Sequence, residues 1–177
     1  MNKKNIARTH DKFYLNENRK SEPKEYFKFI VNHLDSSLDH KSVIDIGCAT
    51  GDFLYYLSTC FSKADLYGAD IDSELLSRTR EEVPRVKKTF NIDITNLKTN
   101  IGKYDTVFML GVHSIFDQLE WILSFKSLLR DKNSRGYIFG IFNPDELDVL
   151  IKGRRSNSNE AWESGWNVFS KASVGKY

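Results

Sequence analysis

Small residues and carboxylates are spaced for ligand chemistry in the stretch VIDIGCATGD, which begins at Val43. An apolar run reaches Asp45 and is followed by Gly47, Ala49 and Gly51 before an amphipathic stretch begins. A glycine corner between a strand and a helix is often purely structural, but it also lets a ligand lie against bare main chain. The corner alone leaves both interpretations open.

A second carboxylate, Asp70, ends the next apolar stretch, about 20 positions after the corner. In dinucleotide-binding sheets, an acidic residue at this distance accepts hydrogen bonds from a ribose, because both of its oxygens are acceptors. The Gly-x-Gly-x-x-Gly fingerprint of those sheets is absent, and Asp45 would repel a pyrophosphate. We therefore expect a ligand with a ribose and a positive charge but no phosphates.

The apolar pattern predicts the strands that position these residues. Five short apolar stretches alternate with helix-patterned segments, which favours an α/β fold with a doubly wound, mainly parallel sheet. The predicted strands are SVIDI, ADLYGAD, RVKKTFNID, KYDTVFMLGV and GYIFGIF. Ligands of such sheets bind at the carboxyl ends of the strands. The glycine corner, Asp70, Asp93 and the segment Leu110–His113 all fall at such ends.

Helices are expected between these strands because apolar residues recur there every three or four positions. One begins near Pro23, one follows Gly51, one opens at Ser73, and the last two cover about 114–129 and 144–152. We expect one unit with three parts. Residues 1–41 form an N-terminal lead-in and helix, residues 42–150 a cofactor-binding core, and residues 151–177 the start of an acceptor-binding segment.

The bulk composition excludes several classes of protein. The chain of 177 residues carries a formal charge of only +2, which does not favour nucleic acid as a partner. No run approaches the roughly 18 apolar residues needed to span a membrane. The two cysteines, Cys48 and Cys60, match neither a disulfide framework nor a metal site, so we expect no metal and a reducing, cytoplasmic setting.

Four segments resemble, in order and spacing, the successive motifs of the Rossmann-like (class I) S-adenosylmethionine-dependent methyltransferases. They are VIDIGCATG, LYGADID, NIDIT and YDTVFMLGVHSIFD, and the resemblance covers about residues 42–145. The chain looks similar to small bacterial methyltransferase-domain proteins. It departs from the family at Ala49, where many members have glycine. The resemblance implies S-adenosylmethionine as the cofactor and methyl transfer as the reaction.

The resemblance also implies roles for residues. The glycine corner would line the methionine end of the cofactor, Asp70 would hold the ribose, and the segment after the fourth strand would flank the methyl group. The adenine would lie against Ile71, Asp93 and Ile94. The cofactor-binding residues so implied are Asp45, Gly47, Cys48, Ala49, Gly51, Asp70, Ile71, Asp93, Ile94, Leu110 and Val112.

The sequence says less about the methyl acceptor than about the cofactor. A hydroxyl acceptor needs a general base, and His113 is the candidate because it follows the fourth strand and has an ordinary pKa near ~6.5. A helix-start histidine with a surface role is the other interpretation. The family's Asn-Pro-Pro-aromatic element for nucleobase amines is missing after the fourth strand, which disfavours such an acceptor.

Substrate residues are expected in GRRSNSNEAWESGW. Arginines suit a phosphate or carboxylate, and tryptophans could stack on a sugar ring. The candidates are Arg154, Arg155, Trp162 and Trp166. The alternative is a solvated loop whose tryptophans cap the edge of the sheet.

From Asn143 onward, one helix and the tryptophan segment use most of the chain, so we expect the family's sixth and seventh strands to be missing. The segment WNVFSKASVGKY could begin a sixth strand, but a seventh has no room. A fragment, a truncated gene product and a divergent short form stay open. The favoured function is methyl transfer to a small-molecule or sugar-containing acceptor, by O-methylation. A cofactor-binding module that is inactive because its C-terminal part is missing is the alternative, and an NAD(P)-dependent oxidoreductase is less favoured. The oligomeric state is not predicted.

Overall fold

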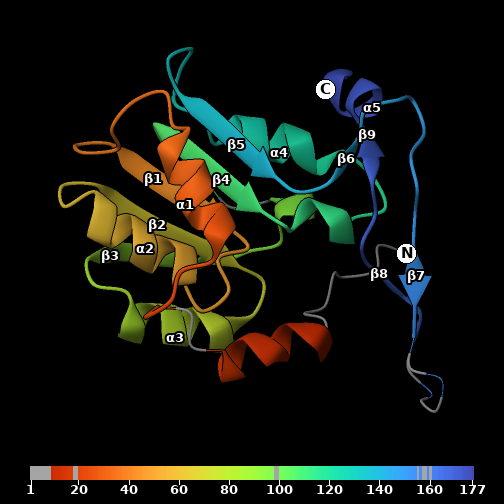
Figure 1. Cartoon of the computed structure of the whole chain (residues 1–177), viewed down its shortest axis with the longest axis horizontal. Helices are drawn as coiled ribbons and strands as arrows, with labels where there is room; N and C mark the ends of the chain where they lie inside the picture. The colour runs from red at the N-terminus through yellow and green to blue at the C-terminus, as the bar shows by residue number, and fades with distance from the viewer. Residues whose placement is uncertain (1–8, 18–19, 98–99, 155, 157–158, 160) are drawn as a thin grey trace.

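The centre of the computed structural model is a five-stranded parallel sheet in the order β3-β2-β1-β4-β5 (Figure 1). The strands are β1 (Ser42–Ile46), β2 (Asp65–Asp70), β3 (Val86–Asn91), β4 (Thr106–Leu110) and β5 (Arg135–Phe139). The structure describes residues 9–17, 20–97, 100–154, 156, 159 and 161–177. The strand order reverses between β1 and β4, which is where sheets of this type bind ligands.

Helices cover both faces of this sheet. The helices α1 (Glu25–Asn32), α2 (Asp52–Cys60) and α3 (Ser73–Glu82) contribute to one apolar core, together with Val43 and Phe108. The helix α4 (Trp121–Ser127) and the short 3-10 helix η2 (Ile94–Asn96) pack on the other face, against Ile44 and Met109. The doubly wound α/β fold expected from the sequence is therefore confirmed.

The central strands β1 and β4 are apolar without alternation because both of their faces are covered. Val43, Ile44, Val107, Phe108 and Met109 have no exposed surface. Burial of each such side chain contributes about 1.5–3 kcal/mol. These strands hold the two segments on which the candidate site is built, so the site rests on the most buried part of the sheet.

Two of the expected helices differ from the structure. The helix expected over 114–129 is split into the 3-10 helix η3 (His113–Ile115) and α4, because Phe116 is extended and its carbonyl accepts a hydrogen bond from Asn167. The helix expected over 144–152 is wrong. There the side chain of Asn143 bonds the backbone of Asp145 and Leu147, and such local bonds compete with helix formation.

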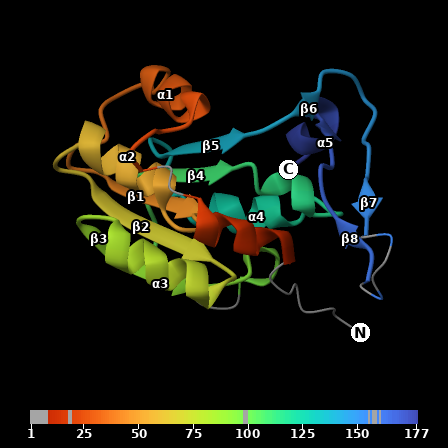
Figure 2. The ribbon, with the colours of Figure 1, turned by 60° about the horizontal axis from the view of Figure 1, so that its bottom comes forward.

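The C-terminal part instead forms two small sheets and a short helix. β6 (Phe142–Asn143) pairs with β9 (Phe169–Ser170), β7 (Lys152–Gly153) pairs with β8 (Glu163–Ser164), and α5 is Lys171–Gly175. Within the described ranges, no strand joins the main sheet beyond β5. Figures 1 and 2 show β7 and β8 projecting beyond the carboxyl ends of β4 and β5.

The N-terminal lead-in contains a 3-10 helix, η1 (Thr9–Asn16), that the sequence pattern does not predict. Arg78 of α3 donates a hydrogen bond to the carbonyl of Leu15 at 2.8 Å. Lys20 lies 3.0 Å from Asp52 of α2 and also pairs with Glu82 of α3. The segment is therefore fastened to two helices, and it appears in red beside α3 in Figure 2.

Candidate cofactor-binding site

The glycine corner between β1 and α2 is tied to the two elements beside it. The backbone N–H groups of Gly47 and Cys48 donate to the carbonyl of Ala69 at 2.7 and 3.1 Å. The N–H of Ala49 donates to Asp70 at 2.9 Å, and the Thr79 hydroxyl donates to the carbonyl of Ala49 at 2.7 Å. Four hydrogen bonds therefore hold the corner in a single conformation.

Three residues of this corner have left-handed backbone: Gly47 at φ 75°, Ala49 at φ 47° and Gly51 at φ 79°. Glycine adopts this region without strain, whereas alanine is uncommon there. Space adds a second constraint, because a Cβ on Gly47 would lie 2.2 Å from Cγ2 of Val112. The side chain of Val112, just after β4, therefore lies directly on the corner, and its contact with the cofactor beside the methyl group stays a prediction.

Two carboxylates lie beneath and beside the corner. Asp45 is 3% exposed, and its Oδ1 has no hydrogen-bond partner among the described residues. Burial raises the pKa of Asp45 well above its ordinary value, and the nearby charge of Asp70 adds to this rise. A buried carboxylate without a partner is costly, so the site favours a ligand that brings a positive charge or a hydrogen-bond donor.

Asp70 ends β2 with both oxygens engaged by main chain. One accepts from Ala49, and the other accepts from the N–H of Asp72 at 2.9 Å. Burial raises the pKa of Asp70, and these two hydrogen bonds partly offset the rise. Each carboxylate oxygen has a further lone pair, so Asp70 can still accept two hydrogen bonds from a ribose.

These observations fit a nucleoside that carries a sulfonium and an ammonium group. The unpaired oxygen of Asp45 can accept a hydrogen bond or face a positive charge, and the oxygens of Asp70 have lone pairs left for a ribose. The main chain at Gly47 is covered by the side chain of Val112. A pyrophosphate fits poorly, because two carboxylates would lie close to its charges. The fit of the donor set therefore agrees with the cofactor that the motifs imply.

The residues expected to contact the adenine, Ile71, Asp93 and Ile94, have structural contacts of their own. Oδ1 of Asp93 accepts from the N–H and the hydroxyl of Thr95 at 2.9 and 2.7 Å, so this carboxylate caps η2. Ile94 is buried in the core, and Ile71 is half-buried. The side chain of Asn91 donates to the carbonyl of Ile71 at 2.8 Å and fixes its backbone. The adenine contacts of Ile71, Asp93 and Ile94 stay predictions.

Cys48 and Leu110 complete the implied set. The Cys48 thiol is buried and packs close to Gly68, where an added Cβ would lie 2.8 Å from its sulfur. Burial raises the pKa of the Cys48 thiol, so the thiol stays protonated, and the contact of its backbone with the cofactor stays a prediction. Leu110 is half-buried at the end of β4.

His113 lies in the interior and not on the surface. It is 1% exposed, its ring stacks on Phe142 with centroids 4.6 Å apart, and an added Cβ on Gly140 would meet its Cε1 at 1.8 Å. Its Nε2 lies 3.5 Å from the carbonyl of Ile141, whereas its Nδ1 has no partner in the described part of the chain. Burial lowers the pKa of His113, which keeps the imidazole neutral. The surface interpretation is wrong, and the role as a base stays a prediction.

The expected substrate residues lie on the projecting C-terminal segment. The guanidinium of Arg154 lies 5.2 Å from the ring centroid of Trp162. Trp162 is 59% and Trp166 is 70% exposed, so neither tryptophan caps the edge of the sheet. Arg155 lies outside the described residues. The structure brings Arg154 and Trp162 together but does not bury either of them.

Sequence reasoning missed three residues at this site. Thr79 has no exposed surface and supports the corner from α3. Tyr26 of α1 stacks on Phe139 with centroids 5.0 Å apart, and burial together with the charge of Asp45 raises its pKa. The charge of Asp11 in η1 also raises the pKa of Asp70. No local pattern marks these residues, because segments that are distant in the sequence bring them near the corner.

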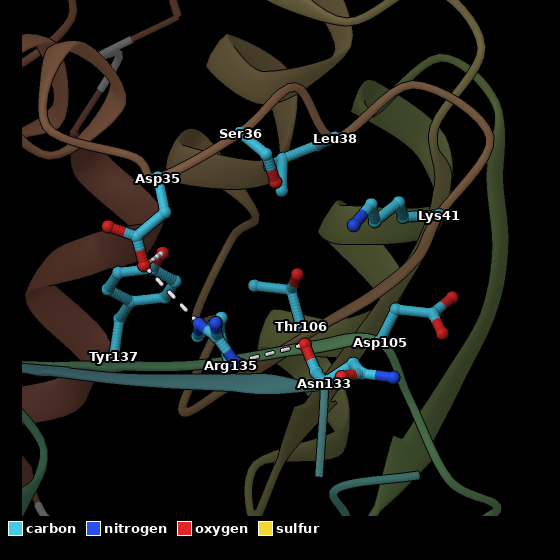
Figure 3. A pocket seen from close by; sticks show the side chains of 9 residues that line it. All are labelled: Asp35, Ser36, Leu38, Lys41, Asp105, Thr106, Asn133, Arg135 and Tyr137. Carbon is cyan, nitrogen blue, oxygen red and sulfur yellow. Dashed lines mark hydrogen bonds and ion pairs between the residues drawn. The ribbon is translucent and has the colours of Figure 1, made fainter. Parts of the chain in front are cut away.

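The cavity drawn in Figure 3 lies at the opposite, amino-terminal edge of the sheet. Its volume is about 190 Å³, and it reaches Thr106 and Arg135, the first residues of β4 and β5. Asp35 pairs with Arg135 at 3.3 Å, and Asp105 pairs with Arg130 at 3.4 Å. These ion pairs connect the loops at the amino-terminal edge of the sheet, away from the glycine corner.

Comparison with known proteins identifies the family. Residues 44–133, half of the chain, match the methyltransferase domain family. The chain belongs to this family of methyltransferase domains. The S-adenosylmethionine-dependent methyltransferase family expected from the four motifs is thereby confirmed. No curated protein matches the chain.

Solved structures agree on the fold. DesVI of Streptomyces venezuelae is 16% identical, with a TM-score of 0.62 over 94% of this chain and 85% of its own. A putative methyltransferase in complex with the Trm112 activator of Haloferax volcanii is 14% identical, with a TM-score of 0.62 over 77% of this chain and 63% of its own. PKMT2 of Rickettsia typhi, solved with AdoHcy, is 22% identical with a TM-score of 0.50, and the match spans 58% of this chain but only 21% of PKMT2.

Two further expectations concern what the site and the chain lack. Among the described residues, no group of three or more His, Cys, Asp or Glu side chains could hold a metal ion. The described helices include none that is long and apolar enough to cross a membrane.

Proposed function

We propose that this chain binds S-adenosylmethionine at the carboxyl ends of β1, β2 and β4 and transfers its methyl group to a small-molecule or sugar-containing acceptor. The observation that carries the proposal is the buried Asp45 carboxylate with an unpaired oxygen, next to a glycine corner that Asp70 and Thr79 hold in place. Membership of the methyltransferase domain family supports it.

The residues divide the work of binding. Asp70 accepts from the ribose hydroxyls, and the main chain of the corner lies along the methionine part of the cofactor. Asp45 offers its unpaired oxygen to the positive charge. When bound, the cofactor supplies an electrophilic methyl group on a sulfonium that leaves as a neutral thioether. Val112, packed on Gly47, helps to exclude water and to fix the line along which the acceptor approaches.

O-methylation requires a proton acceptor for the hydroxyl. His113 is suited by its protonation state, because its lowered pKa leaves the imidazole neutral at pH 7. Its Nδ1 has no partner within the described ranges and so can take a proton. Arg154 and Trp162 offer a cation and an aromatic face to an anionic or sugar-containing acceptor.

The proposed organisation follows from these roles. Residues 42–150 bind the cofactor, residues 1–41 form an N-terminal lead-in and helix, and residues 151–177 begin the segment that contacts the acceptor. The free cysteines Cys48 and Cys60 support a reducing, cytoplasmic location.

The test is methyl transfer by the purified chain. Label from S-adenosyl[methyl-³H]methionine is followed into the small-molecule, glycan, protein and nucleic-acid fractions of a cell extract. We expect label in the small-molecule or glycan fraction. Label in protein or nucleic acid alone refutes the acceptor class. Binding of the cofactor without any labelling favours the inactive binding module.

A further inference from the structure

The C-terminal arm, defined as residues 149–154 and 161–168, is fastened to the loop after β4 by one buried side chain. We propose that Asn167 is a positioning residue that holds this arm as a wall of the acceptor site. The inference rests on the proposed methyl transfer, because an acceptor site exists only if the chain transfers a methyl group.

Asn167 is 1% exposed and uses its whole amide. Its Nδ2 donates to the carbonyl of Phe116 at 2.7 Å and lies 3.5 Å from a carboxylate oxygen of Asp117. Its Oδ1 accepts from the N–H of Ile151 at 2.7 Å, and its own N–H donates to the carbonyl of Ser114 at 2.9 Å. One residue therefore joins both halves of the arm to the loop after β4.

Asp117 provides a second link between the same segments. Its carboxylate accepts from the hydroxyl of Ser164 and pairs with the ammonium of Lys152 at 3.1 Å. Within the arm, the backbones of Val149 and Val168 exchange two hydrogen bonds of 2.9 Å. The arm is thus internally paired and attached to the loop at two places.

Few apolar side chains of the arm are buried. Leu150 is 51%, Ile151 is 42% and Trp166 is 70% exposed. Phe169, directly after the arm, is 3% exposed and belongs to the core, so apolar burial anchors the chain at that end of the arm. Along the arm itself, the polar contacts of Asn167 and Asp117 provide the links to the loop after β4.

The place of attachment connects the arm to the cofactor site. The loop that Asn167 binds begins next to Val112, whose side chain lies on Gly47 of the glycine corner. Figures 1 and 2 show the arm beyond the carboxyl ends of β4 and β5, the edge of the sheet at which the cofactor is proposed to bind. Arg154 and Trp162 are carried on it. A fixed arm therefore presents these side chains at a fixed distance from the methyl group.

The experiment compares Asn167→Asp with Asn133→Asp in the full chain. Asn167→Asp keeps the oxygen that accepts from Ile151, removes both donor hydrogens and places a charge beside Asp117. Asn133→Asp makes the same chemical change at an exposed position on the opposite edge of the sheet. The readouts are the affinity for S-adenosylhomocysteine by calorimetry and the methyl label that enters the small-molecule and glycan fractions.

We expect Asn167→Asp to bind S-adenosylhomocysteine within about twofold of wild type and to lose about tenfold or more of the labelling, because a displaced acceptor loses its alignment. Asn133→Asp should match wild type in both. Unchanged labelling overturns the inference, and so does a parallel loss of binding and labelling. If Asn167→Asp does not fold, Asp117→Asn at its exposed position replaces it, with the same outcomes.

A failure of the proposed methyl transfer can be told apart from a failure of the inference about Asn167. In that case wild type and both variants bind the cofactor product equally but none labels any fraction, and the wall role falls with the methyl transfer. Hydrogen exchange at the N–H of Ile151 supplies a readout besides activity. Exchange that is faster in Asn167→Asp than in Asn133→Asp supports the attachment, whereas equal exchange overturns it.

Discussion

The hydroxyl of Thr79 is the support of the glycine corner that can be removed with the least other change. Thr79 has no exposed surface, and its Oγ1 lies 2.7 Å from the carbonyl of Ala49 and 3.2 Å from that of Leu75. Since a hydroxyl has one hydrogen, the shorter contact receives it. Ala49 needs this support because its φ of 47° is uncommon for alanine.

Thr79→Val replaces the hydroxyl by a methyl group of similar size. It leaves the half-buried carbonyl of Ala49 with only the weak Cys48 thiol as a donor, which costs about 1–2 kcal/mol. If the corner relaxes to satisfy this carbonyl, the whole cost must be recovered on binding, and affinity falls by about 5- to 30-fold. Thr79→Ser keeps the donor and should stay within about threefold of wild type, by the same relation.

The assay is calorimetric titration with S-adenosylhomocysteine, together with thermal unfolding of each variant. Affinity that is the same in Thr79→Val and wild type refutes the reasoning. A loss in Thr79→Ser as large as the loss in Thr79→Val refutes it as well, because then the volume of the side chain decides and not its hydrogen bond.

Gly47→Ala should abolish binding of S-adenosylhomocysteine and lower the unfolding temperature, because the new Cβ would lie 2.2 Å from Val112. Gly111→Ala is the matched control, with φ 74° but nothing within 4 Å, and should retain binding; equal behaviour of the two variants in a titration contradicts the packing argument. Asp45→Asn should raise the unfolding temperature of the ligand-free chain at pH 7 while weakening binding. Burial raises the pKa of Asp45 in the folded state above its value of about 3.9 in the unfolded chain. Above about pH 4, ionisation of Asp45 therefore favours the unfolded chain, and this destabilisation grows with pH until Asp45 is also ionised in the folded state. The gain should therefore shrink toward pH 4, and a gain that is the same at both pH values would contradict this account.

The sequence predicts the strands well where burial is complete on both faces. β4 carries four consecutive apolar residues, 107–110, and β1 carries three, Val43, Ile44 and Ile46, around the buried Asp45. The helix expected over 144–152 is wrong for the opposite reason. Its amphipathic pattern is real, but the backbones of Val149 and Ile151 bond to Val168 and Asn167, which are distant in sequence.

The residues of the candidate site also fall into those that the sequence can place and those that it cannot. Asp45 and Asp70 can be placed from sequence, because the ends of parallel strands meet at one edge of a sheet. Thr79 and Asn167 cannot, since each acts on a backbone group 16 or more positions away along the chain. His113 follows β4 as expected, but its burial against Gly140 and Phe142 depends on how the chain turns after β5.

The most direct measurement is a pair of calorimetric titrations of the full chain, one with S-adenosylhomocysteine and one with NAD, repeated on Asp70→Asn. A phosphate-free nucleoside held by carboxylates predicts one site for S-adenosylhomocysteine in wild type, weaker binding in Asp70→Asn, and no heat with NAD. Binding of NAD, or binding of S-adenosylhomocysteine that the Asp70→Asn change leaves untouched, would contradict it.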